Sequence, residues 1–215
     1  MRKDFEKYLK SEKISSFYYN KTVKNISGVE SPWVSGGNVF EELLKSRIII
    51  LSGELDQYLC EYAKASLIYM ESLDSSSDIT LYINSPGGSV YDGLGLLDVM
   101  DYIKPDIVTV NTGLAASMGA IILTSGTSGK RKSLKRSRVM IHQPMIYGSS
   151  TQQASDLEIE ARQINKLKKE LYTIISKTTG QKYDKVHKDG DRDYWMDSKD
   201  AKEYGIIDEI LEKRK

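Results

Sequence analysis

The sequence predicts an α/β protein whose sheet is mainly parallel, and three observations carry this prediction. Four short apolar runs, at 47–51, 79–83, 107–110 and 138–141, have the length of buried strands. Between them lie segments whose apolar residues recur at helical spacing. Glycine, proline and serine, the usual turn formers, separate many of these segments. Helices alternating with nearly continuous apolar strands indicate parallel pairing, with both faces of the sheet covered.

The expected elements begin near residue 39 and alternate almost to the C-terminus. Helices are expected at 39–45, 55–70, 90–103, 118–123, 154–177 and 197–204, and a last strand at 206–210. Pro105 and Gly205 are placed to end the third and the last of these helices. Residues 1–38 are polar and rich in lysine and serine, so they predict an N-terminal arm or a removable leader before a domain at 39–215.

The helix expected at 154–177 is about six turns long and highly charged. Its apolar residues recur at intervals of three and seven, which places them in one stripe. The stripe consists of Leu157, Ile164, Leu167, Leu171 and Ile174. A crossover that only covers a sheet needs about half this length. The stripe therefore predicts packing against something outside the first core, such as another subunit.

The charge balance excludes a strong attraction to nucleic acid or to anionic membranes. The chain has 31 lysines and arginines against 30 acidic residues, a net charge of +1. One basic cluster stands out, at 130–138, formed by Lys130, Arg131, Lys132, Lys135, Arg136 and Arg138. No aromatic residue is interleaved with these cations, so the cluster predicts a solvated loop rather than a nucleic-acid site.

Other features of the composition narrow the class further. The single cysteine, Cys60, lies in an apolar, helix-like stretch and is expected to be a small buried hydrophobe. No disulfide framework, no apolar run of about 20 residues and no secretory signal core are present, so a cytoplasmic location is expected. No pair of histidines or cysteines has metal-ligand spacing, so no metal is expected.

The segment 112–120 contains a serine in a position suited to nucleophilic chemistry. A strand ends there, small residues follow, and Ser117 lies where an apolar helix begins. This is the pattern of a nucleophile elbow, in which the serine is exposed on a tight strand-to-helix turn. The backbone N–H of Met118 would be free to stabilise developing negative charge. The residues alone leave an alternative open, that Ser117 only caps the helix.

Only two histidines are available as a base for the serine. His142 directly follows an apolar strand, at the sheet edge where α/β proteins place their sites, whereas His187 lies in a polar run and is expected on the surface. An imidazole base is usually oriented by a carboxylate. Asp189, Asp191 and Asp193 are all candidates, and the residues alone do not choose among them.

A glycine-rich turn at 84–89 follows the strand at 79–83 and reads Asn-Ser-Pro-Gly-Gly-Ser. Its two glycines allow a sharp turn that brings backbone N–H groups close to a ligand. Phosphate binding lacks support, because no Walker lysine follows. By itself such a turn is more often a plain connection than a binding site.

Taken together, three of these motifs resemble a known family. Leu-Tyr-Ile-Asn-Ser-Pro-Gly-Gly at 81–88, Ala-Ala-Ser-Met-Gly-Ala at 115–120 and Ser-Arg-Val-Met-Ile-His-Gln-Pro at 137–144 are similar to the signature blocks of Clp protease proteolytic subunits. Similarity continues at 191–193 and 203–208, and it runs from about residue 40 to 210. The resemblance implies a crotonase-like α/β fold of repeated ββα units with a protruding handle helix at about 145–178.

The same resemblance implies a serine endopeptidase with Ser117 as nucleophile, His142 as base and Asp193 as the orienting carboxylate. It implies an oxyanion hole formed by the N–H groups of Gly88 and Met118. This gives the glycine-rich turn a function, since residues 87–89, Gly87-Gly88-Ser89, would also pair with an extended substrate.

The family further implies a homo-oligomer of two stacked seven-membered rings that enclose the active sites. Unfolded polypeptide would be fed in by a ring-shaped Clp-type AAA+ unfoldase, so ATP is the cofactor of that partner and none is expected in this chain. Tyr82 and Tyr102 are similar in position to the apolar clefts where the ATPase docks.

Two alternatives belong to other classes. A catalytically silent subunit that assembles with an active paralogue is motivated by the segment 145–153, which is apparently two residues longer than in the family. An acyl-CoA enzyme of the crotonase superfamily would share the fold, but such enzymes lack this pairing of serine and histidine.

Overall fold

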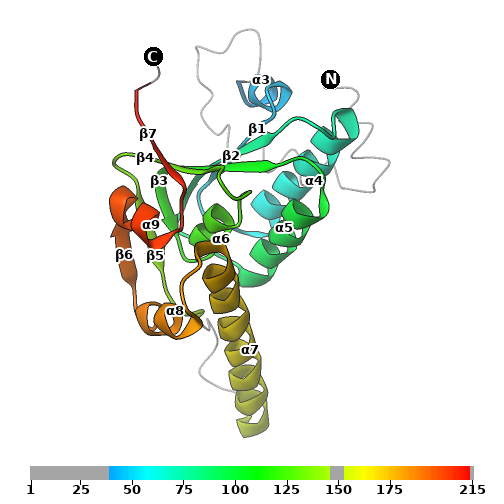
Figure 1. The fold of residues 1–215 in the computed structure, drawn as a ribbon. Helices are drawn as coiled ribbons and strands as arrows, with labels where there is room; N and C mark the ends of the chain where they lie inside the picture. Colours follow the sequence, from blue (N-terminus) through cyan, green and yellow to red (C-terminus); the bar gives the residue numbers. More distant parts are fainter. Residues whose placement is uncertain (1–38, 146–152, 214–215) are drawn as a thin grey trace, which may run out of the picture.

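The computed structural model describes residues 39–145 and 153–213, which form one seven-stranded sheet with helices packed against it (Figure 1). The predicted N-terminal arm and most of the segment 145–153 lie outside the described residues. The strands are β1 (Ile48–Ser52), β2 (Ile79–Ser85), β3 (Ile107–Ala116), β4 (Arg131–Leu134), β5 (Arg138–Ile141), β6 (Tyr194–Asp197) and β7 (Glu209–Leu211). The helices are α3 (Val39–Lys45), α4 (Gln57–Leu73), α5 (Val90–Tyr102), α6 (Met118–Thr124), α7 (Ala154–Thr179), α8 (Tyr183–Asp189) and α9 (Ser198–Tyr204).

The predicted parallel sheet is confirmed for most of its strands. Its main path runs β1-β2-β3-β4-β7, and every neighbouring pair on that path is parallel. Strand β3 is long enough to pair twice along one edge, with β4 through residues 109–111 and with β5 through residues 114–116. The end of β3 therefore lies beside the end of β5. Strand β6 was not predicted and adds to β5 in the antiparallel direction.

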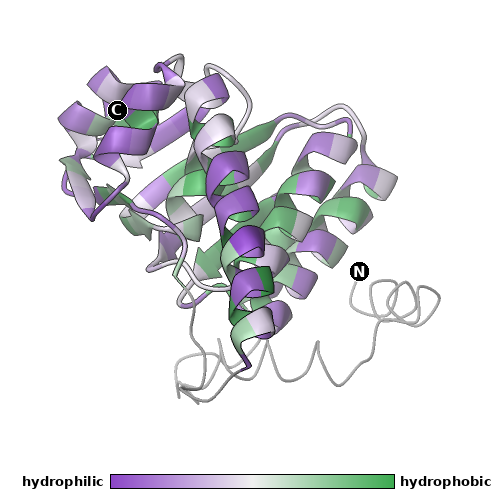
Figure 2. Cartoon of the chain, turned by 90° about the horizontal axis from the view of Figure 1, so that it is seen from below, coloured by the Kyte–Doolittle hydropathy of each residue, from purple (hydrophilic) through white to green (hydrophobic). Residues whose placement is uncertain are grey.

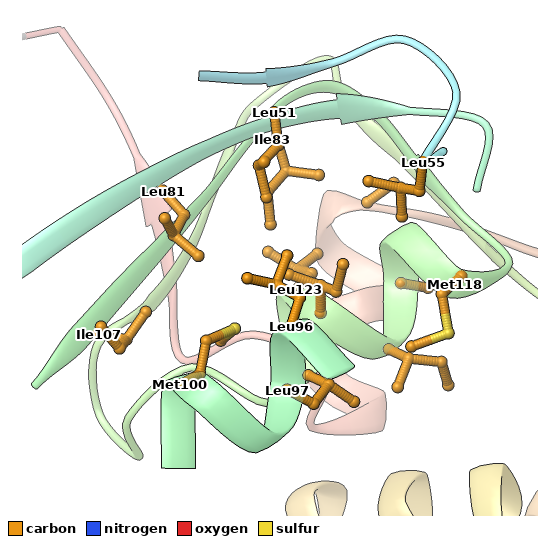
Figure 3. Packing of buried hydrophobic residues seen from close by; sticks show 14 of the residues in the cluster. Leu51, Leu55, Leu81, Ile83, Leu96, Leu97, Met100, Ile107, Met118 and Leu123 are labelled. Atoms are coloured by element: carbon orange, nitrogen blue, oxygen red, sulfur yellow. The ribbon is translucent and has the colours of Figure 1, made fainter. Parts of the chain in front are cut away.

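The core lies between the sheet and the helices α4, α5 and α6. Figure 3 shows side chains of β1 and β2, such as Leu51 and Leu81, meeting Leu96 of α5 and Leu123 of α6; all four are fully buried. In the hydropathy view, apolar residues of α4 and α5 gather on their inner faces, whereas α7 is mostly hydrophilic (Figure 2). Burial of the apolar faces supplies the main driving force for this packing.

Helix α7 protrudes from the body of the chain (Figure 1). Its buried residues are Leu171, Tyr172 and Ile175, all near its C-terminal end. Toward its N-terminal end, Leu157 and Ile159 are 53% and 57% exposed. The helix ends where Gly180 adopts the left-handed conformation, two residues later than predicted.

The basic cluster corrects one prediction, because two of its six cations, Arg131 and Lys132, lie on strand β4 and not in a solvated loop. The side chain of Arg131 is only 8% exposed and forms an ion pair with Asp208. The Asp208 Oδ2 atom accepts hydrogen bonds from both the backbone N–H and the Nε of Arg131, each at 2.9 Å. A further guanidinium N–H donates to the carbonyl of Thr178 at 2.7 Å. The arginine is therefore a buried link between β4, α7 and the turn before β7.

The Asp208→Ala variant is expected to lower the free energy of unfolding by about 3 kcal/mol, because it leaves the Arg131 charge buried without a partner. The hydrogen bonds from Arg131 hold the pKa of Asp208 below its usual value. The contribution of the pair is thus present above the usual carboxyl pKa of about 4 and is lost as the pH falls through the lowered value. Thermal unfolding at fixed protein concentration, as a function of pH, measures both effects.

Glu209→Ala is the matched control for this prediction. Glu209 pairs with Lys132 between β4 and β7, but the two side chains are 53% and 29% exposed, so an effect below about 1 kcal/mol is expected. Equal losses for the two variants would contradict the structural role given to Arg131.

Candidate active site

The turn between β3 and α6 places Ser117 in an unusual backbone conformation. Its φ of 54° and ψ of −124° lie in a region that side-chain-bearing residues rarely adopt, which is typical of functional turns. The N–H of Ser117 donates to the carbonyl of Met140 on β5 at 2.9 Å, which fixes the turn to the neighbouring strand. The Ser117 side chain makes no capping hydrogen bond. Ser117 does stand at the N-cap position of α6, but the missing hydrogen bond disfavours the alternative that capping is its only role.

Glycines let the turn at 84–89 approach this serine closely. A Cβ added at Gly87 would lie 2.6 Å from the Ser117 Cβ and 3.0 Å from the backbone nitrogen of Met118. A Cβ added at Gly119 would lie 3.2 Å from the carbonyl oxygen of Ser85. The two motifs therefore pack backbone against backbone, which only glycine permits at Gly87.

The structure brings Ser117, His142 and Asp193 together in one hydrogen-bonded row. The Nε2 atom of His142 lies 2.9 Å from the Ser117 Oγ, and its Nδ1 lies 3.0 Å from the Asp193 Oδ1. The antiparallel register pairs Ile141 with Tyr194, so His142 and Asp193 leave adjacent strand ends side by side. The imidazole is mostly buried, with 12% of its side chain exposed, whereas the Asp193 side chain is 60% exposed. Ser117 can donate to one ring nitrogen while the other donates to the carboxylate.

The two other candidate carboxylates lie elsewhere. Asp189 pairs with Lys185 and accepts a hydrogen bond from the Tyr204 hydroxyl at 3.0 Å. Asp191 forms an ion pair with Lys168, with 3.7 Å between the Oδ1 and Nζ atoms. His187 is exposed on α8, as predicted.

Two backbone N–H groups next to Ser117 bond to none of the described residues, those of Gly88 and Met118. The contacts of Leu55 explain why the N–H of Gly88 has no such bond. The Leu55 N–H donates to the carbonyl of Gly87, and the Leu55 carbonyl accepts from the N–H of Ser89, both at 2.8 Å. Because polar groups alternate sides along an extended chain, the N–H of Gly88 points away from Leu55. This backbone role of Leu55 was not predicted, since its apolar side chain gives no signal for it.

A cleft of about 720 Å³ opens over Ser117 and His142. One wall comes from residues 86–91, and the other includes Ile164 and Leu167 of α7. The predicted apolar stripe of α7 is thus used partly within this chain. A small apolar pocket adjoins the serine and the imidazole, lined by Val90, Met118, Ile121, Ile141, Pro144, Leu171 and Ile175. The cleft has room for an extended chain, whereas the small pocket, about 10 Å³, has room for no more than a water molecule.

The remaining predicted positions lie away from this cleft. Tyr82 is half-buried on β2, and Tyr102 is 84% exposed at the end of α5; neither lines the cleft. Cys60 is fully buried, and burial raises the pKa of its thiol to about 12, so it is not a reactive group.

The described part of the chain has neither a metal-binding cluster nor a membrane-spanning helix. There, no group of three or more histidine, cysteine or carboxylate side chains is placed to hold a metal ion. Within residues 39–145 and 153–213, no helix has the length and apolar character that crossing a bilayer requires.

Comparison with known proteins decides the family. The family model described as Clp protease matches residues 34–214. The chain belongs to the Clp protease family. Clp protease proteolytic subunits are serine peptidases, and this chain is one of them. The mainly parallel α/β fold expected for the family is confirmed, and the acyl-CoA alternative is wrong.

Several Clp proteins resemble the chain over nearly its whole length. An ATP-dependent Clp protease proteolytic subunit from Bacteroides fragilis (strain YCH46) is 48% identical over 220 residues, which cover 98% of this chain and 99% of the relative. The subunit of the same name from Bacteroides thetaiotaomicron has the same identity and coverage. That from Porphyromonas gingivalis is 53% identical over 178 residues, or 83% of this chain and 79% of the relative.

Proposed function

We propose that this chain is an endopeptidase that cleaves unfolded polypeptide with Ser117 as nucleophile, His142 as general base and Asp193 as orienting group. The single observation that carries the proposal is the continuous row of short contacts from Asp193 through His142 to Ser117 at the cleft. A serine hydroxyl is a weak nucleophile by itself, and a base within hydrogen-bond reach is what activates it.

In the proposed reaction His142 first accepts a proton and then donates it, in both acylation and deacylation. The Ser117 Oγ attacks the carbonyl carbon of the peptide bond while His142 Nε2 takes its proton. His142 then gives that proton to the leaving amine as the peptide bond breaks, which leaves an acyl-enzyme. Water attacks the acyl-enzyme with His142 again as base, and the Ser117 hydroxyl is restored. Asp193 accepts the Nδ1–H bond, which selects the productive tautomer and stabilises the imidazolium. The oxyanion accepts hydrogen bonds from the N–H groups of Gly88 and Met118.

Substrate would bind as an added strand. The edge of residues 87–89 that faces away from Leu55 offers backbone groups to an extended chain. Backbone pairing of this kind is independent of sequence, which suits a peptidase of low specificity. The cleft of about 720 Å³ over Ser117 would hold the substrate side chains next to the scissile bond.

The relatives are named as subunits of an ATP-dependent Clp protease. We propose that this chain likewise forms a cytoplasmic homo-oligomer of two stacked seven-membered rings, with α7 as the handle between rings. The exposed apolar residues Leu157 and Ile159 support this use of α7. A Clp-type AAA+ unfoldase would supply unfolded chains and consume ATP, docking near Tyr82 and Tyr102, so that this chain itself needs no cofactor.

Reaction of the purified protein with a fluorophosphonate tests the proposal. Mass spectrometry is expected to show one adduct on Ser117, because only a base-activated serine is phosphonylated efficiently. Ser117→Ala should remain unlabelled. Ser125→Ala is the matched control, since Ser125 ends the same helix and its buried hydroxyl has no hydrogen-bond partner among the described residues; this variant should label like the wild type. An adduct on another residue, or equal labelling of Ser117→Ala, would contradict the proposal.

A further inference from the structure

The position of Asp193 needs an explanation, because its own segment offers little support. Residues 190–193 connect α8 to β6 and belong to neither. The Asp193 side chain is 60% exposed, so packing does not hold it. Its carboxylate nevertheless lies 3.0 Å from the Nδ1 of His142. The pairing of Tyr194 with Ile141 anchors one end of this segment beside His142, and contacts from elsewhere must hold the rest of it.

Tyr172 of α7 provides one such contact. Its side chain is completely buried, and its hydroxyl donates a hydrogen bond to the carbonyl of Gly190 at 2.5 Å. Gly190 packs directly on the ring, since an added Cβ would lie 2.9 Å from ring carbon and hydroxyl atoms. The ring is itself held edge-on by His187 of α8, with ring centroids 5.6 Å apart. Burial raises the pKa of Tyr172 to about 12, so the hydroxyl stays a donor at neutral pH.

Lys168 provides a second contact, one helical turn before Tyr172 on the same face of α7. Its Nζ donates to the Gln143 Oε1 at 3.0 Å and lies 3.7 Å from the Asp191 Oδ1. The Gln143 Nε2 in turn donates to the backbone carbonyl of Asp191 at 2.7 Å. Gln143 directly follows His142, so this chain of contacts links α7 to the flanks of both the imidazole and the carboxylate. The lysine ammonium also lies 5.7 Å from the centroid of the Tyr172 ring.

We propose that Lys168 and Tyr172 are positioning residues for catalysis, which hold residues 190–193 so that Asp193 meets His142. The inference rests on the proposed function and adds to it. Because both residues lie on α7, the C-terminal half of this helix would help to hold Asp193, His142 and Ser117 in line. Displacements of about 1 Å at supporting residues can lower the rate of an enzyme by as much as 100-fold. The expected signature is a loss of kcat while substrate binding is preserved.

Tyr172→Phe tests this with the smallest change available, since it keeps the ring and removes only the hydroxyl. Its kcat for a small peptide, counted per fluorophosphonate-reactive site, is expected to fall about tenfold, with KM within about twofold of the wild type. Tyr183→Phe is the matched control. Its ring lies in the same cluster, 6.5 Å from that of Tyr172, but its hydroxyl bonds to none of the described residues, so kcat should not change. A residue that only stabilises the fold would lower the number of reactive sites and leave kcat per site unchanged, which would overturn the proposal.

A double-mutant cycle with Asp193→Asn identifies the route of the effect. If Tyr172 acts through Asp193, the double variant should be no slower than Asp193→Asn alone. Losses that multiply would overturn the proposal. If Tyr172→Phe fails to assemble, Lys168→Met runs the same cycle, because it retains the apolar stem and removes the ammonium donor. A fully active Asp193→Asn enzyme would contradict the proposed function itself, whereas a slow Asp193→Asn enzyme beside unaffected α7 variants would contradict this inference alone.

Discussion

His142→Ala is expected to lower kcat for a small unfolded peptide by about 10⁴- to 10⁶-fold, with little change in KM. The imidazole is within 3.0 Å of both its partners, so its removal leaves the Ser117 hydroxyl without a base and Asp193 without a role. Activity that remains would come from the oxyanion hole and from substrate binding alone. Steady-state hydrolysis of a fluorogenic peptide by the assembled protein measures the loss.

His187→Phe is the control for this prediction, because the two histidines are the only ones in the chain. Phenylalanine keeps the edge-on contact with Tyr172 and removes the titratable ring, so kcat should stay within about twofold of the wild type. The double variant Ser117→Ala/His142→Ala should be no slower than either single variant, since the two groups act as a unit. His142→Ala activity within about tenfold of the wild type would be incompatible with its role as general base.

Apolar strands were predictable from the sequence, whereas strands buried through polar contacts were not. Strands β1, β2, β3 and β5 are apolar runs, and each was predicted within a few residues, although β3 extends to Ala116. Strand β4 reads Arg-Lys-Ser-Leu and looks solvated, yet its inward side chains are Arg131 and Ser133. They are buried because Asp208 and Ser198, more than 60 residues further along, satisfy them. A local pattern contains no information about partners at that distance.

Local sequence patterns likewise allowed some residues of the site to be predicted and not others. Ser117, His142 and the glycine-rich turn lie in local motifs, so they were predicted from short segments and from a family resemblance. The choice of Asp193 over Asp189 and Asp191 depends on how β6 pairs with β5, and β6 was not predicted. Its residues Tyr194 and Trp195 are 36% and 54% exposed, so the strand has no regular alternation of buried and exposed residues to reveal it. The resemblance supplied the aspartate, and the strand register supplies its physical reason.

Substitution of Gly88 is expected to have the second large effect on kcat, because its backbone packs closely on Leu55 and its N–H is a proposed oxyanion donor. An added Cβ would lie 2.4 Å from the carbonyl oxygen and 2.7 Å from the nitrogen of Leu55, both backbone atoms of a fixed chain. Neither atom can move aside as the tip of a flexible side chain would. The Gly88→Ala variant must therefore break the two hydrogen bonds to Leu55 or rotate the peptide unit that carries the Gly88 N–H. Both changes move that donor away from the Ser117 side of the loop.

Gly88→Ala is expected to lower kcat by about 10²- to 10³-fold, the usual effect of losing one oxyanion donor. Gly95→Ala is the matched control, since Gly95 lies within α5 and an added Cβ there would meet only the Lys64 Nζ at 3.5 Å. This second variant should keep its kcat and gain up to about 1 kcal/mol of stability from the better helix former.

Inhibition constants separate a lost donor from general damage to the cleft. A peptide boronate, which mimics the tetrahedral intermediate, should bind Gly88→Ala more weakly by about the same factor as the loss of kcat/KM, because both depend on the same transition-state contact. Unchanged boronate affinity beside a large loss of kcat/KM would remove Gly88 from the oxyanion hole and leave Met118 as its only donor in this chain's described residues.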